Sequence, residues 1–303
     1  MRLDQYPYVS IVSTTLHDEA PYLQGVIAKQ HALFDDPWLR AFEDDLAVCF
    51  AQNNEALREA TRGYIKFALD GMLLQKRFNK AGRYEPKNFE QAAAEVYSNE
   101  QYMHTLYLPG IYLSHFLWKH HYLQYKRFQE MFLPLVLKHG GMHFYDVGVG
   151  TGFYSREMLR NVPHLTGTGF DLSRHSLKYT QNMISAFGLS SRYEGQLRNI
   201  LVEPSPPTAP FVVNVEVLEH LEDPVAFLTG LYHILEPGGF GMITAAVTAP
   251  NADHIYLYNS VDEVVTHIEA AGFGIIDACE DAAYQPLKAH ESVPRNASVI
   301  VTR

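Results

Sequence analysis

The strongest constraint on the fold of this chain is a glycine-rich turn, residues 146–152, with the sequence Asp-Val-Gly-Val-Gly-Thr-Gly. The apolar run His143–Val147 is predicted to be a β-strand, and Phe153–Arg160 after the turn is predicted to be a helix. Glycines let a backbone approach a ligand closely, and the helix N-terminus directs N–H groups at it. The three segments together predict a site for a nucleotide-type cofactor in an α/β sheet.

The rest of the C-terminal half supports a parallel sheet, because short apolar runs alternate with helical stretches. Further strands are predicted at Leu165–Phe170, Phe211–Val215, Gly241–Val247 and Ser298–Val301. Asp171 directly follows the first of these strands, and its carboxylate is expected beside the turn, where it can accept ribose hydroxyls. Ser173 is expected to cap the next helix.

The N-terminal half has helical periodicity with no strand-like run. The expected order is helix from residue 36 onward, a loop at 79–86, a helix over 89–108 ending near Pro109-Gly110, and a helix over 111–137 with Pro134 as a kink or an end. Gly140-Gly141 is the predicted boundary between a helical domain, 1–139, and an α/β domain, 140–303.

Composition narrows the class of protein. With 303 residues, 47% hydrophobic and 19% charged, the chain can bury a sizeable core. A net charge of -10 argues against a nucleic-acid partner, which requires a dense basic face. No apolar stretch reaches the length of a membrane span, and the first residues lack a signal core. Cys49 and Cys279 lie far apart, which favours a cytoplasmic protein over a disulfide framework.

The spacing Asp-x-Gly-x-Gly-x-Gly resembles motif I of the class I S-adenosylmethionine-dependent methyltransferases. Phe153 stands where a dinucleotide fingerprint has glycine or alanine. Residues 216–224 resemble the family's Glu-x-Leu-Glu-His-x-x-Asp-Pro segment, 235–239 its turn before strand five, and 270–273 the end of its last helix. The resemblance implies a Rossmann-like α/β sheet of seven mostly parallel strands with an N-terminal all-helical domain, S-adenosyl-L-methionine as cofactor and S-adenosyl-L-homocysteine as product.

The resemblance also implies which residues contact the cofactor. They are Asp146, Gly148, Gly150, Gly152 and Phe153 at the turn, Asp171 and Leu172 after the second strand, and Gln196, Leu197, Glu216 and Val217 in later segments. The family commonly has an acidic residue after strand three for the adenine amino group. Gln196 lies in the corresponding stretch and either offers its amide oxygen or is a plain loop residue. Strand four ends in Asn214, where a small residue or aspartate is usual.

Methyl transfer from a sulfonium is an in-line displacement that requires alignment and exclusion of water, with a base where the acceptor carries a proton. Glu219, His220 and His254 are the candidate catalytic residues, and the alternative role for Glu219 and His220 is to order their loop. Candidate substrate contacts are Asn251 and Tyr258 after strand five and Tyr102, His115 and Tyr125 in the helical domain. No metal site is predicted, because His115, His120 and His121 lack a ligand-like spacing.

The expected function is methylation of oxygen, nitrogen or carbon in a small metabolite, with the helical domain as a lid and a surface for homodimerisation. The acidic loop would suit a cationic, amino-acid-like acceptor, and the aromatic helices would suit a planar one. Two alternatives stay open at this stage. One is a methyltransferase-like subunit that binds a partner without catalysis, and the other is an NAD(P)-dependent oxidoreductase.

Overall fold

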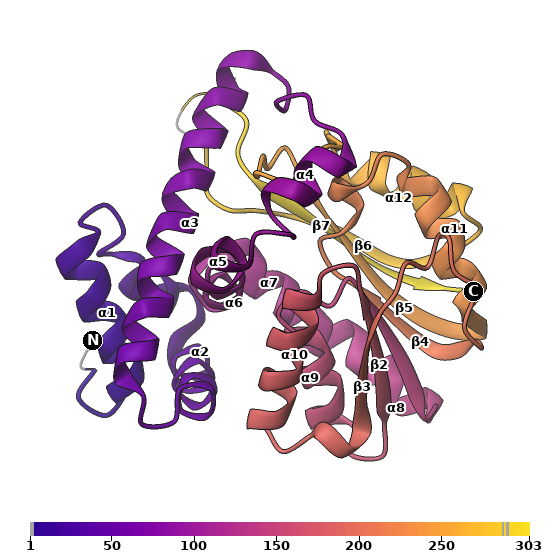
Figure 1. The fold of residues 1–303 in the computed structure, drawn as a ribbon, viewed down its shortest axis with the longest axis horizontal. Coiled ribbons are helices and arrows are strands. Elements are labelled where there is room, and N and C mark those ends of the chain that lie inside the picture. Colours follow the sequence, from indigo (N-terminus) through magenta and orange to yellow (C-terminus); the bar gives the residue numbers. More distant parts are fainter. Residues whose placement is uncertain (1–2, 287, 289–290) are drawn as a thin grey trace.

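The structure is a computed structural model that describes residues 3–286, 288 and 291–303. Figure 1 shows an N-terminal helical region lying against one side of a twisted sheet that carries helices on both faces. Within the described residues, no helix combines the length and apolarity needed to span a bilayer.

The sheet confirms the predicted fold class. Its seven strands have the order β3-β2-β1-β4-β5-β7-β6. Pairing is parallel from β3 to β5, and β7 is antiparallel to both of its neighbours. The strands are β1 (His143–Val147), β2 (Thr166–Asp171), β3 (Tyr193–Leu197), β4 (Ala209–Asn214), β5 (Leu235–Val247), β6 (Gly274–Ala282) and β7 (Arg295–Thr302). The chain reverses its direction of travel across the sheet between β3 and β4, so the carboxyl ends of β1 and β4 border a crevice suited to ligands.

Two hydrophobic clusters fill the two faces of the sheet. One contains apolar side chains of α8 (Leu133–His139), α9 (Phe153–Asn161) and α10 (Arg174–Ala186). The other contains those of α11 (Pro224–Ile234) and α12 (Val261–Ala270). The first cluster also includes buried residues of the helical region, such as Trp38 and Phe116, so the helical region and the sheet share a continuous core.

The helical region begins earlier than the sequence analysis expects. Its elements are α1 (Pro7–Glu19), α2 (Val26–Cys49), α3 (Asn54–Ala81), α4 (Phe89–Glu95), α5 (Glu100–Tyr102), α6 (Leu108–Leu117) and α7 (Lys119–Arg127). Asp35 has φ 57° and interrupts α2 just before Pro37, so the helix predicted from residue 36 is the part after this kink. Asn99 caps a new helical start, so the single helix expected over 89–108 is in fact interrupted.

The prediction of a helix end at Pro109-Gly110 is wrong. A π-helical turn, Met103–Tyr107, leads directly into α6, and a second, Phe128–Phe132, precedes Pro134 in the same way. A wider turn relieves the clash between a proline ring and the carbonyl four residues earlier. The break lies instead at Trp118, which is extended. The Phe116 carbonyl at this break accepts hydrogen bonds from the side chains of Gln30 and Trp38.

The five strands predicted from periodicity are all present, with ends shifted by up to six residues. Periodicity alone missed β3 and β6, which the family resemblance supplied only as a strand count. Both lie at the edges of the sheet, and none of their residues is fully buried. A half-solvated edge strand lacks the continuous apolar run of a central parallel strand, so its signal in the sequence is weak.

Candidate active site

The glycine-rich turn joins β1 to α9, and its three glycines all have positive φ: Gly148 80°, Gly150 52° and Gly152 74°. A Cβ on Gly148 would lie 2.4 Å from the Val217 side chain, and one on Gly152 would lie 2.6 Å from Thr180. A Cβ on Gly150 would meet no atom within 4 Å. Gly148 and Gly152 therefore permit close packing, and Gly150 leaves its backbone open toward a ligand.

Two carboxylates lie beside this turn. Asp146 is buried at the end of β1 and accepts a hydrogen bond of 2.6 Å from the Ser155 hydroxyl. Asp171, at the end of β2, accepts hydrogen bonds from the backbone N–H groups of Gly150 at 3.2 Å and Ser173 at 2.7 Å. Burial raises the pKa of Asp146 to about 7 and that of Asp171 to about 6. The Ser173 side chain caps α10, as predicted.

A cavity of about 1150 Å³ runs from this turn to the loops after β4 and β5 and on between helices α2, α3 and α6. Most of the residues singled out in the sequence line it, namely Asp146, Gly148, Gly150, Phe153, Asp171, Leu172, Glu216, Val217, Glu219, His220, Asn251, His254 and His115. The glycine-rich turn and the candidate catalytic residues therefore border the same space.

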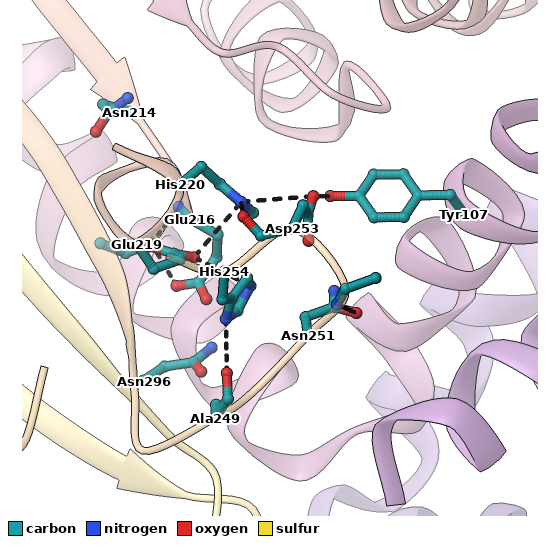
Figure 2. A network of polar contacts seen from close by, with 12 residues as sticks. Tyr107, Asn214, Glu216, Glu219, His220, Ala249, Asn251, Asp253, His254 and Asn296 are labelled. Atoms are coloured by element: carbon teal, nitrogen blue, oxygen red, sulfur yellow. Dashed lines mark hydrogen bonds and ion pairs between the residues drawn. The ribbon is translucent and has the colours of Figure 1, made fainter. Parts of the chain in front are cut away.

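Glu219, His220 and His254 converge on one point of this cavity (Figure 2). The Glu219 carboxylate Oε1 lies 3.9 Å from His220 Nε2 and 4.0 Å from His254 Nε2. Glu219 is fully buried, and within the described part of the chain neither of its carboxylate oxygens has a hydrogen-bond partner. Burial, reinforced by the neighbouring Glu216 carboxylate, raises the pKa of Glu219. Burial lowers the pKa of His254 to about 3.

Backbone contacts hold this cluster in place. The Glu219 carbonyl accepts hydrogen bonds from the N–H groups of Ile255 and Tyr256, which fasten the loop after β5 to the turn after β4. Glu216 has φ 54° and accepts a hydrogen bond of 2.9 Å from the Thr244 hydroxyl. The side-chain amide of Asn214 donates to the Val147 carbonyl at 2.7 Å and so ties the ends of β4 and β1 together. A non-glycine residue with positive φ beside these groups is the kind of strain found at functional sites.

Asp253 is a site residue that was not predicted from the sequence. It is fully buried, and its carboxylate accepts hydrogen bonds from the hydroxyls of Tyr97, at 3.0 Å, and Tyr107. The same carboxylate lies 3.4 Å from Nδ1 of His220 (Figure 2). Although burial opposes both shifts, this pairing raises the pKa of His220 and lowers that of Asp253. Asp253 thus connects the helical region to the imidazole cluster.

The structure places several predicted site residues away from the cavity. Gln196 lies on the edge strand β3, where its amide donates to Glu194, and Leu197 is 56% exposed. The segment that follows, Arg198–Leu201, lines the cavity instead. Gly152 is not in the lining, because it packs against Thr180 as described above.

Three predicted substrate contacts also lie elsewhere. The Tyr125 hydroxyl donates to Glu157 at 2.6 Å, and the Tyr258 hydroxyl is 3.0 Å from His267 Nδ1. Tyr102 packs with Tyr107 and does not reach the cavity wall. Tyr97 and Tyr107 line the cavity in their place. Helical periodicity indicates a shared face but not which side chain of an aromatic-rich helix points inward.

His115 and Phe153 form a wall of the cavity, with ring centroids 4.2 Å apart in a stacked arrangement. Phe153 is 1% exposed and begins α9 as an anchor in the core. A dinucleotide fingerprint has a small residue at this position so that helix and strand can pack closely. The bulky, buried ring therefore counts against the nicotinamide alternative.

Comparison with known proteins agrees with this geometry. Residues 145–240 match the family model of a methyltransferase domain. A ubiquinone biosynthesis O-methyltransferase of Maricaulis maris is 30% identical over 107 residues, which is 35% of this chain and 41% of that protein. A malonyl-[acyl-carrier protein] O-methyltransferase of Halalkalibacterium halodurans is 30% identical over 95 residues, 31% of this chain and 35% of that protein. The chain thus spans less than half the length of these relatives.

Among solved structures, an O-methyltransferase family protein from Burkholderia thailandensis has a TM-score of 0.56 at 15% identity, covering 80% of this chain and 71% of that chain. This likeness shows a common fold. Residues 145–240 are thus similar to a methyltransferase domain, and the sheet order and the glycine-rich turn agree with the class I S-adenosylmethionine-dependent methyltransferase fold. The matched segment is similar to O-methyltransferases.

Proposed function

We propose that this chain transfers a methyl group from S-adenosylmethionine to a hydroxyl oxygen of a small molecule. One observation carries the proposal: the glycine-rich turn with Asp171 and the cluster of Glu219, His220 and His254 line the same cavity. Oxygen is favoured over nitrogen and carbon because the relatives over this segment are O-methyltransferases. A hydroxyl acceptor must also lose a proton, which the cluster can take.

The residues at the turn fit the cofactor. Asp171 offers a carboxylate to the ribose hydroxyls, Leu172 is exposed beside it, and the open side of Gly150 lets the backbone approach the ligand. Glu216 and Val217 border the same part of the cavity. Bound S-adenosylmethionine would supply an electrophilic methyl group on a sulfonium sulfur. The chain's own part is to orient the two reactants and exclude water.

The acceptor is proposed to lie next to Glu219, His220 and His254. Formation of the methyl–oxygen bond would break the methyl–sulfur bond and leave a neutral thioether as the leaving group, and the hydroxyl proton of the acceptor would pass to this cluster. Asp253 holds Nδ1 of His220 and leaves its Nε2 toward Glu219. The helical region would act as a lid, with His115 and Asn251 as acceptor contacts. A cytoplasmic location and dimerisation through the helical region stay predictions from the sequence.

Asp171→Ala is expected to weaken S-adenosylmethionine binding about 100-fold, because two charge-assisted hydrogen bonds to ribose would be lost. Calorimetric titration with S-adenosylmethionine and S-adenosylhomocysteine measures this change. Ser173→Ala is the matched control, since it removes the cap of α10 and a 3.5 Å hydrogen bond to the Tyr97 carbonyl but keeps the backbone N–H that donates to Asp171, and it should leave the Kd within a factor of a few. An unchanged Kd in Asp171→Ala would exclude the ribose role.

The same carboxylate predicts a pH dependence. Because burial raises the pKa of Asp171 to about 6, the ligand-free protein becomes protonated there below that pH. Ribose hydroxyls require the ionised carboxylate, so affinity should be constant above about pH 6 and fall about tenfold per unit below it. Two other titratable groups, Asp146 and His220, act electrostatically on Asp171, and the pKa of Asp146 is raised to about 7. Both groups remain in an Asp171→Asn variant, so this variant isolates the contribution of Asp171. That variant should therefore lose the steep dependence, and an affinity that falls as steeply below pH 6 as in the wild type would contradict the assignment.

Methyl transfer itself is tested with S-adenosylmethionine carrying a labelled methyl group and fractions of hydroxylated metabolites. The expected result is label in a product that mass spectrometry identifies as a methyl ether or ester. Tight cofactor binding without transfer to any fraction would instead support the subunit that binds a partner without catalysis. Absence of cofactor binding would remove the proposed function altogether.

A further inference from the structure

The cluster of Glu219, His220 and His254 has a geometry that a proton-accepting role alone does not require. One ligand atom from each side chain lies within 4.8 Å of the others. The two distances from Glu219 Oε1 to the imidazole Nε2 atoms, 3.9 and 4.0 Å, are too long for direct hydrogen bonds. The three groups thus surround a shared point without bonding to one another.

The backbone fixes which nitrogen of each ring faces this point. Nδ1 of His254 lies 2.6 Å from the Ala249 carbonyl oxygen, and Nδ1 of His220 lies 3.1 Å from the Asp253 carbonyl oxygen. A carbonyl oxygen can only accept, so each Nδ1 carries a proton and donates it. A neutral ring then presents a lone pair on Nε2. Metal-binding histidines characteristically donate their second ring N–H to a carbonyl or carboxylate in this way.

The carboxylate completes the set. Glu219 is 0% exposed, and both of its oxygens lack hydrogen-bond partners among residues 3–286, 288 and 291–303. A buried carboxylate without donors is strongly disfavoured unless a cation or a proton compensates it. The Nε2 lone pair of a neutral His254 ring, 4.0 Å from the same carboxylate, increases the repulsion. An electron-pair acceptor placed between the three groups would relieve it.

We propose that Glu219, His220 and His254 bind one divalent transition-metal ion. Two imidazoles and one carboxylate favour ions such as Zn²⁺, Co²⁺ or Fe²⁺ over Mg²⁺, which prefers oxygen ligands. At metal–ligand distances of about 2.1 Å, tetrahedral ligand atoms lie about 3.4 Å apart, so the two distances from Glu219 to the imidazoles need to shorten by about half an ångström, and the two imidazoles, whose ligand atoms lie within 4.8 Å of each other, need to approach as well. Such a movement lies within small side-chain adjustments.

The ion would keep a position open toward the cavity, because all three side chains line that cavity. There it could hold the acceptor oxygen and lower the pKa of the acceptor hydroxyl. This role rests on the proposed methyltransferase function, but metal binding itself can be tested without cofactor or acceptor. A second group, Glu100, His104 and His175, also brings ligand atoms within 4.8 Å, with Glu100 exposed at the surface. It serves as an internal comparison.

The test is a titration of the chelator-treated 303-residue chain with Co²⁺, followed by visible absorption, in the absence of cofactor and acceptor. The expected result is one bound Co²⁺ per chain with a four- or five-coordinate spectrum, displaced by Zn²⁺. His254→Gln should weaken Co²⁺ binding on the order of 100-fold. His175→Gln, in the second group, should leave the affinity and the spectrum unchanged.

Three results would overturn the proposal: no Co²⁺ spectrum in the wild type at a large excess of the ion, unchanged binding in His254→Gln, or loss of binding in His175→Gln. The first needs no variant and so does not depend on whether a variant folds. Thermal unfolding and calorimetry with S-adenosylhomocysteine report whether His254→Gln is folded. Cofactor binding without Co²⁺ binding would refute the metal site and leave the proposed function standing. Co²⁺ binding without cofactor binding would refute the proposed function and leave the metal site standing.

Discussion

Replacing Arg156 with methionine is expected to lower the free energy of unfolding by about 3–5 kcal/mol, measured by denaturant titration. Arg156 is 1% exposed, and its guanidinium lies 2.6 Å from Asp45 and 3.2 Å from Glu157. The variant would leave Asp45 buried with the Tyr112 hydroxyl as its hydrogen-bond donor and Arg160 at 3.9 Å, whereas Glu157 would keep the Tyr125 hydroxyl and Arg160 at 3.0 Å. Protonation of Asp45, whose pKa is already raised by burial, limits the loss.

Arg160→Met is the matched control for this prediction. Arg160 also contacts Glu157, at 3.0 Å, but its side chain is 44% exposed, and an exposed ion pair contributes at most about 1 kcal/mol. Adding Asp45→Asn to Arg156→Met should recover part of the loss, because the amide removes one of the uncompensated charges. A loss below 1 kcal/mol in Arg156→Met, or an equal loss in Arg160→Met, would show that the buried network does not hold α2 against α9.

This network illustrates what the sequence could not predict. Arg156 and Glu157 lie on the helix after the glycine-rich turn, where a surface position is the usual expectation for charged residues. Their burial depends on Asp45 and Tyr112, which come from the helical region. Since local periodicity does not reveal which helix of a bundle packs on which, only the tertiary structure shows the pairing.

The cofactor side of the site was more accessible to prediction. The turn, Asp171 and Ser173 follow from local rules about glycine, strand ends and helix caps, and those rules act over a few residues. Asp253 was missed because its partners Tyr97 and Tyr107 lie about 150 residues away in the chain. Its sequence signal was limited to a position in a polar loop after β5, next to His254.

The helical elements show the same distinction. Proline is a good local signal for a helix end, but the π-helical turns before Pro109 and Pro134 let both helices continue. Trp118 has no breaking signal of its own. The extended backbone there depends on the side chains of Gln30 and Trp38, which satisfy the freed Phe116 carbonyl from another helix. Local helix propensity does not predict long-range hydrogen bonds of this kind.

Glu219→Gln is expected to lower kcat by about 10²- to 10⁴-fold while leaving the affinity for S-adenosylmethionine nearly unchanged. The amide has almost the same shape, but it cannot take the acceptor proton and carries no charge for a cation. Because the carboxylate is fully buried without a hydrogen-bond partner in the described chain, removing its charge should leave the free energy of unfolding unchanged or raise it. Stability and activity would then change in opposite directions, as expected where a functional site retains strain.

Kinetics with a saturating acceptor, calorimetry with S-adenosylhomocysteine and denaturant titration on the same preparations measure the three quantities. Glu269→Gln, at an exposed position of α12, is the control and should change none of them. If Glu219 only ordered the turn after β4, its replacement would lower stability and leave kcat within a few-fold once the protein is folded. A purely structural role is the less favourable interpretation, because the backbone carbonyl of Glu219, which the substitution retains, makes the hydrogen bonds to Ile255 and Tyr256 that order the loop.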